Sequence, residues 1–250
     1  MASARLLAAL LALSGGSSCR RASPPAEPPA APKAEPPAAP PARGVEVWPG
    51  LVEGTPDDLA LAWRAPWLNG TFVLKDGRVT DRADRRLLSC ADLDGIQADD
   101  VQLGPAWEHY NFTEKSIRCR ALALVRRAAG APVGYMADVV SSNDPGDLLP
   151  AAMAPAANQA ASWRAADPTL TFDRAAARAD HRELVVGGTY RGRMTWWASG
   201  DFNGDGIADA LVFLNLARTS NPDAPNIMRA FVLTRRQLHG PVTVLHQISP

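Results

Sequence analysis

The stretch from Asp201 to Asp209 constrains the fold more than any other part of this 250-residue chain. It reads Asp-Phe-Asn-Gly-Asp-Gly-Ile-Ala-Asp, with an oxygen-bearing side chain at every second position from Asp201 to Asp205. A hard cation such as Ca2+ prefers about six to eight oxygen ligands, and a tight turn brings alternate side chains to one point. The stretch therefore predicts a calcium-binding turn between two consecutive elements of secondary structure.

The predicted ligands are three side-chain oxygens, one main-chain carbonyl and a closing carboxylate that binds directly or through water: Asp201, Asn203, Asp205, Ile207 and Asp209. Gly206 allows the sharp bend, because glycine adopts a positive φ without steric cost. An EF-hand has a bidentate Glu at the twelfth position, where this chain has Val212. The flanks 195–198 and 210–214 are typical of strands rather than of helices. We therefore expect the loop to join two strands.

Residues 200–212 resemble the calcium loops of FG-GAP and VCBS-type repeats in secreted bacterial proteins. The resemblance implies a structural Ca2+ that holds a turn between two strands of a sheet. Repeats of that family normally occur several to a chain and build a propeller. This chain has one clear copy and a partial echo at 92–95, so we do not expect a propeller. The alternative is a turn without metal, because Asn, Asp and Gly favour turns in any case.

The N-terminus has the pattern of an export signal. Arg5 is followed by an apolar run at 6–13, by small residues at 14–18 and then by Cys19. Residues 1–18 are therefore predicted to be a signal peptide. A cysteine directly after small residues resembles the lipobox of bacterial lipoproteins, which implies lipidation of Cys19 and a membrane as partner. The alternative is ordinary cleavage to a soluble periplasmic or secreted protein.

Residues 19–43 form a spacer that is rich in Pro and Ala. Such a segment lacks large apolar side chains to bury, and it is typical of an extended, semi-rigid linker. A linker directly after a lipid anchor would hold a folded domain away from a membrane surface. The sequence thus predicts a protein of the bacterial cell envelope, with its folded domain at 44–250.

Charge and cysteine content limit the function classes. Lys and Arg together number 26, and so do Asp and Glu, so there is no basic excess of the kind that nucleic-acid binding needs. If Cys19 carries lipid, Cys90 and Cys119 remain as an even pair. In an oxidising compartment such a pair predicts a disulfide, which would stabilise the fold by about 3 kcal/mol. The alternative is two buried free thiols.

The periodicity of the domain predicts an α+β fold, with a possible sub-boundary near 141–180. The N-terminal part is predicted to be helical with one hairpin. Its expected elements are a helix entered at Thr55–Asp58, a hairpin over Phe72–Thr80 with its turn at Asp76–Gly77, a helix over Asp81–Ala91, a helix over Thr113–Ala128, a strand over Val133–Val140 and short helices within 147–166.

The C-terminal part is predicted to be an antiparallel meander. Its five expected strands are each bounded by turn residues: Glu183–Val186, Thr189–Ala198, Ile207–Leu216, Met228–Thr234 and Val242–Ile248. The calcium loop would join the second strand to the third. Trp196 and Trp197 are neighbours on one strand and so point to opposite faces. One ring should be in the core, and the other either in the core or exposed to a sugar or a partner.

Catalytic motifs are absent from the sequence. None of the four histidines lies in an H-E-x-x-H pattern, and there is no G-x-S-x-G motif or P-loop. Glu108 and His109, beside Trp107 and Tyr110, form either a site or a surface polar cluster. We therefore expect a binding or structural module without assigned catalysis. The alternatives are a calcium-stabilised envelope hydrolase or carbohydrate-active protein, and an accessory protein or inhibitor of a secreted enzyme.

Overall fold

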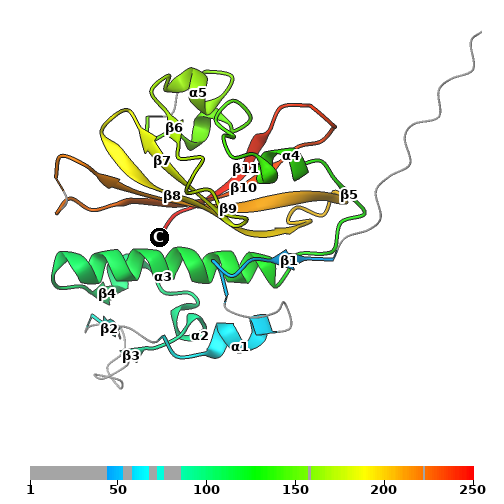
Figure 1. Cartoon of the computed structure of the whole chain (residues 1–250). Helices are drawn as coiled ribbons and strands as arrows, with labels where there is room; N and C mark the ends of the chain where they lie inside the picture. The colour runs from blue at the N-terminus through cyan, green and yellow to red at the C-terminus, as the bar shows by residue number, and fades with distance from the viewer. Residues whose placement is uncertain (1–43, 53–57, 68–71, 76–85, 157–158, 222) are drawn as a thin grey trace, which may run out of the picture. The chain divides into compact units, whose positions relative to one another are not determined.

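The computed structural model describes residues 44–52, 58–67, 72–75, 86–156, 159–221 and 223–250 (Figure 1). Its main element is a sheet whose central path is an antiparallel meander of six consecutive strands. They are β6 (Thr171–Phe172), β7 (His181–Val186), β8 (Tyr190–Gly200), β9 (Ile207–Arg218), β10 (Ile227–Thr234) and β11 (Thr243–Ile248). The predicted α+β class and C-terminal meander are confirmed, and the 201–209 stretch joins the second and third predicted strands.

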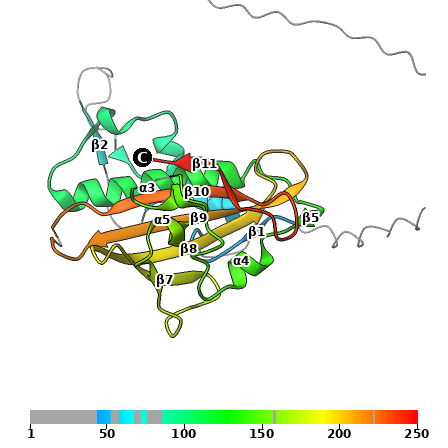
Figure 2. The same cartoon turned by 90° about the horizontal axis from the view of Figure 1, so that it is seen from above.

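Two short strands extend the sheet at one end. β1 (Glu46–Val47) pairs antiparallel with β8, and β5 (Val133–Gly134) pairs parallel with β9. Both lie at the end of the sheet where the β8–β9 loop turns (Figure 1, Figure 2). The loop is therefore flanked by backbone from two distant parts of the chain.

One face of the sheet is covered by the long helix α3 (Ala106–Val125) (Figure 1). Its buried residues recur at helical spacing, and they share a core with the inward side chains of β8, β9 and β10. The helix contributes Phe112, Ile117, Ala121, Leu122 and Val125; the strands contribute Trp197, Leu211, Phe213, Ala230 and Val232. This stripe explains why α3 lies against the sheet.

A smaller layer packs on α3. It contains α1 (Leu59–Arg64), α2 (Cys90–Leu93), the 3-10 helix Ala98–Asp100 and a three-stranded sheet of β2 (Phe72–Leu74), β3 (Arg86–Leu87) and β4 (Val101–Gln102). The opposite face of the large sheet is covered by α4 (Ala137–Ser141), the 3-10 helix Ala151–Met153 and α5 (Trp163–Ala166). Because both faces are covered, β9 is buried along most of its length.

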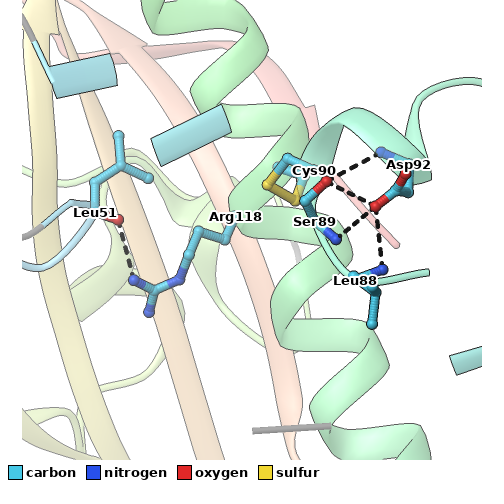
Figure 3. The surroundings of a disulfide bond; sticks show 7 residues. Leu51, Leu88, Ser89, Cys90, Asp92 and Arg118 are labelled. Carbon is cyan, nitrogen blue, oxygen red and sulfur yellow. Dashed lines mark hydrogen bonds between the residues drawn. A yellow bond between two sulfur atoms is a disulfide. The ribbon is translucent and has the colours of Figure 1, made fainter. Parts of the chain in front are cut away.

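The predicted disulfide is confirmed. Cys90, the first residue of α2, is bonded to Cys119 in the middle of α3 (Figure 3). Ser89 and Asp92 form a capping box, in which the Ser89 amide donates to the Asp92 carboxylate at 3.0 Å. The four-residue helix α2 is therefore held by its cap and by a covalent bond to the longest helix.

The N-terminal boundaries differ from the predicted ones. Helix α3 begins at Ala106 rather than after Thr113, and its N-cap is Pro105. The earlier start has an apolar anchor, since the ring of Phe112 packs edge-on against Phe72 at 5.2 Å. The Glu108 carboxylate also accepts the Gly104 amide at 2.6 Å.

Four other expectations in the N-terminal part were wrong or only partly tested. β2 pairs with β3 and β4; the turn at Asp76–Gly77 and the rest of the predicted hairpin up to Thr80 lie outside the described residues. Arg86–Leu87 is a strand rather than part of a helix over Asp81–Ala91. Within Val133–Val140 only the first two residues are strand, and Ala137 starts α4 because Val139 packs fully buried into the core. Of the predicted helix start at Thr55–Asp58, residues 55–57 lie outside the described residues, whereas Asp58 is the N-cap of α1, which follows at Leu59 as expected.

Both adjacent tryptophans are in the core. Trp196 and Trp197 are 0% and 1% exposed, and they belong to the cores on opposite faces of the sheet. The register between β8 and β9 shifts here, because Trp196 pairs with Val212 and Ala198 pairs with Leu211. Trp197 stacks on Phe213 with ring centroids 4.4 Å apart. Neither ring is available for stacking on a sugar.

Candidate functional site

The predicted calcium loop is held on one flank by the chain that follows α3. Ala129 and Asp201 exchange two main-chain hydrogen bonds, of 2.9 and 3.2 Å. A few residues later, β5 pairs with the first residues of β9 at Ile207. The loop is therefore anchored to the sheet rather than projecting from it.

Asp201 organises the turn. Its Oδ1 accepts the amides of Asn203, Gly204 and Asp205 at 3.3, 2.6 and 3.2 Å, and its Oδ2 accepts the Gly206 amide at 2.8 Å. Burial raises the pKa of this carboxyl, but the four N–H donors outweigh burial and hold its pKa below the ordinary value. Gly204 and Gly206 both have φ of 80°, as the tight turn requires. The carboxylate form of Asp201 is therefore favoured.

Asn203 and Asp205 are exposed and bonded to each other and to the turn. Asn203 donates from Nδ2 to Asp205 Oδ2 at 3.0 Å, and its Oδ1 accepts the Asp205 amide at 2.9 Å. Asp205 Oδ1 accepts the Ile207 amide at 2.9 Å. Because both side chains are at the surface, rotation about their side-chain bonds can turn their oxygens elsewhere at small cost.

Asp209 differs from the other acids of the loop. It is 0% exposed; its Oδ2 accepts the Phe202 amide at 3.1 Å, and its Oδ1 has no hydrogen-bond partner among the described residues. The pKa of Asp209 is raised to about 6, chiefly by burial and in part by the negative charges of Asp205 and Asp201, while the Thr234 hydroxyl and the Phe202 amide lower it. An ionised carboxylate in this position is unfavourable unless a positive charge compensates it.

Three of the five predicted ligand residues, Asp201, Asn203 and Asp205, lie in the turn between β8 and β9, whereas Ile207 and Asp209 belong to the first residues of β9. Among the described residues, no group of three or more His, Cys, Asp or Glu side chains converges as a metal cluster. The donor types suit Ca2+, since they are all oxygens, and the free Oδ1 of Asp209 supplies one ligand without loss of a hydrogen bond. Cys19, the predicted lipid attachment site, lies outside the described residues.

The sequence analysis missed a polar cleft of about 430 Å³ on the face of the sheet that carries α3. Its walls include Glu114 and Arg118 of α3 and His181, Glu183, Arg193 and Asn215 of the sheet. Asn215 Nδ2 donates to Tyr110 Oη at 3.1 Å, and Asn226 Nδ2 donates to Asn215 Oδ1 at 2.8 Å. The sequence signal that could have indicated this cleft is the alternation along β8, where Arg191 and Arg193 alternate with Gly192 and Met194 and so place two arginines on one face of the sheet.

The Glu108–His109 pair shows no site geometry. Glu108 binds the Gly104 amide, His109 is exposed, and neither lines the clefts found among the described residues. The interpretation as a surface polar cluster therefore fits the described geometry better.

No family model, curated protein or solved structure matches this chain. Among the described residues, no helix has the length and apolar character needed to cross a membrane.

Proposed function

We propose that this chain is an exported, lipid-anchored protein of the bacterial cell envelope that acts as a binding or structural module. A structural Ca2+ bound by Asp201, Asn203, Asp205, Ile207 and Asp209 would stabilise its C-terminal sheet. Cys19 would carry the lipid, and residues 19–43 would form the tether. The observation that carries the calcium assignment is the buried carboxylate of Asp209 with its unpartnered oxygen.

The physical argument concerns the charge of the loop. Asp201, Asp205 and Asp209 lie within nine consecutive residues, and the first two make ionisation of the third less favourable. A divalent cation reverses this repulsion, so its binding contributes to the stability of the fold. Because the loop contacts β8, β9 and the chain around Ala129, that contribution supports the junction of three segments.

Export is supported by the disulfide. A disulfide between Cys90 and Cys119 persists in oxidising compartments such as the periplasm, and it is uncommon in the cytosol. This agrees with the signal-peptide pattern of residues 1–18. Labelling of cells with a radioactive fatty acid tests the anchor: the chain should incorporate label, and Cys19→Ser should abolish it. An unlabelled wild-type chain would refute lipidation.

The calcium assignment is tested by titration of the purified protein, followed by calorimetry and thermal melting. A site with Kd of about 0.1 mM, as in extracellular modules, would stabilise the fold by about 1.4 kcal/mol at 1 mM Ca2+. That corresponds to a rise in Tm of roughly 3–6 °C for a domain of this size. Asp205→Ala should lose the rise, whereas the control Asp223→Ala, an exposed residue outside the loop, should keep it. No response at millimolar Ca2+ would refute the site.

A carbohydrate-active protein is a second candidate, and the polar cleft favours it. The cleft is lined by planar polar side chains, and the bonded group Tyr110–Asn215–Asn226 fixes the orientation of its amides. Fixed donors and acceptors suit hydroxyl-rich ligands. Binding of cell-wall glycan fragments that is lost in Asn215→Ala, with product release measured in parallel, would favour this function. Absence of binding would exclude it.

A further inference from the structure

A second cleft, of about 710 Å³, lies at the loop end of the sheet on the face opposite α3. Much of its wall is apolar: Trp48 follows β1, and Met136, Ala137 and Val140 come from α4 and the residue before it. Trp48 and Val140 are only partly buried, so their side chains border the opening. The volume falls within the range of roughly 300–1,000 Å³ that is typical of small-molecule sites.

The same wall contains a buried positive charge. Arg182 on β7 is 2% exposed. Its guanidinium donates to the carbonyls of Ser142 at 2.7 Å, of Val140 and His181 at 2.8 Å each, and of Arg178. These bonds close the C-terminal end of α4, which is the structural role of Arg182. They use neutral acceptors, however, and no carboxylate of the described residues forms an ion pair with this side chain.

The surroundings of Arg182 disfavour its charge. Burial lowers the pKa of the guanidinium, and the charge of Asp180 opposes this only in part. Four of about five N–H donors of an arginine are used by the carbonyls. One donor therefore remains for an anion, together with a charge that Asp180 compensates only in part.

The rim of the cleft also favours a negative ligand. Arg178 is exposed, and its Nη1 donates to the carbonyls of Ala177 and Ala175, at 3.0 and 3.4 Å. Glu46 is the one acid that lines the cleft among the described residues, against the two arginines. The lining thus combines apolar surface with a net positive charge.

We propose that this cleft binds a small anionic amphiphile, namely a single alkyl chain with a carboxylate head group. The chain lies against Trp48, Met136 and Val140, and the carboxylate lies near Arg178 and Arg182. The apolar wall accounts for the alkyl chain, and the excess of positive charge selects a carboxylate over a neutral or cationic head group. This site is separate from the proposed calcium site and does not depend on it.

Isothermal titration of the protein in calcium-free buffer with dodecanoate, dodecanol and dodecyltrimethylammonium, each below its aggregation concentration, tests the proposal. Dodecanoate should bind at least tenfold more tightly than either of the other two. Equal or tighter binding of the cationic compound would overturn the proposal, as would the absence of dodecanoate binding.

Two surface variants locate the site without removing Arg182. Ala137→Trp places a large ring in the cleft from an exposed position and should weaken dodecanoate binding at least tenfold, whereas Ala60→Trp on α1 should not. Arg178→Glu should weaken dodecanoate binding and leave dodecanol unchanged, whereas Arg236→Glu, outside the cleft, should change neither. Unchanged dodecanoate affinity in Ala137→Trp and Arg178→Glu, with unaltered melting temperatures, would refute the location.

Discussion

Replacement of Asp209 by Asn should have opposite effects in the absence and in the presence of calcium. The side chain is 0% exposed, and it accepts a hydrogen bond from the Phe202 amide. An Asn side chain has nearly the same shape, and its carbonyl oxygen can accept that bond. The substitution therefore removes the charge while it preserves packing.

The magnitude follows from the pKa of Asp209. Burial raises this pKa from 3.8 to about 6. The folded state therefore prefers the protonated form, and above pH 6 the ionised side chain destabilises the metal-free fold by at most about 3 kcal/mol. Asp209→Asn should recover much of this free energy at pH 7.5. It should also abolish calcium stabilisation, because the closing carboxylate of the site is lost.

Urea unfolding at pH 7.5 measures both effects, with a chelator and then with millimolar Ca2+. The variant should unfold at higher urea than the wild type in chelator, and it should show no shift on calcium addition. A less stable variant in chelator would refute the argument that the carboxylate is destabilising. A full calcium response of the variant would refute the role of Asp209 as a ligand.

Three further predictions follow from described features. The metal-free protein should lose stability as the pH rises from about 4 to 7, because Asp209 has a higher pKa in the folded state than in the unfolded state and the folded state therefore holds its proton longer. Urea unfolding that shows stability rising over this range would contradict the prediction. Reduction of the disulfide should lower the free energy of unfolding, measured in urea, by about 3 kcal/mol. The double variant Cys90→Ser, Cys119→Ser has no disulfide, so reductant should leave its free energy of unfolding unchanged. Gly192→Ala should destabilise the fold by at least about 2 kcal/mol, because the added methyl would overlap the Asn215 carbonyl of the neighbouring strand. The control Gly44→Ala has open space around the added methyl, so it should leave the melting temperature unchanged.

The sheet was the most predictable part of the fold. The pattern predicted a strand over Ile207–Leu216, and β9 spans Ile207–Arg218, because apolar runs bounded by turn residues leave few alternatives. The disulfide was predictable because an even pair of cysteines remained. Both signals are local, or need only a count of residues.

The N-terminal part was less predictable because tertiary contacts decide its short elements. Val139 and Val140 favour a strand by propensity, yet they lie in α4, where Val139 is fully buried. Arg86–Leu87 becomes a strand only through pairing with β2. No local pattern distinguishes such pairings from a helix.

The two candidate sites also differ in how far the sequence alone could predict them. The ligand positions of the calcium loop lie within nine consecutive residues, so the sequence alone could propose them. The burial of Asp209 and its unpartnered oxygen required the structure. The apolar cleft was invisible in the sequence because Arg182 meets the carbonyl of Val140 across 42 positions of the chain.

The position of β1 has a mechanical consequence. β1 is the first described strand, and it pairs with Ser199 and Ala198 just before the loop begins at Asp201. In a chain attached to a membrane through its N-terminus, any pulling force enters the sheet through this two-residue pairing. Resistance to force would then depend on the stiffness of the neighbouring loop, and the proposed Ca2+, if bound there, would raise the load at which the domain opens.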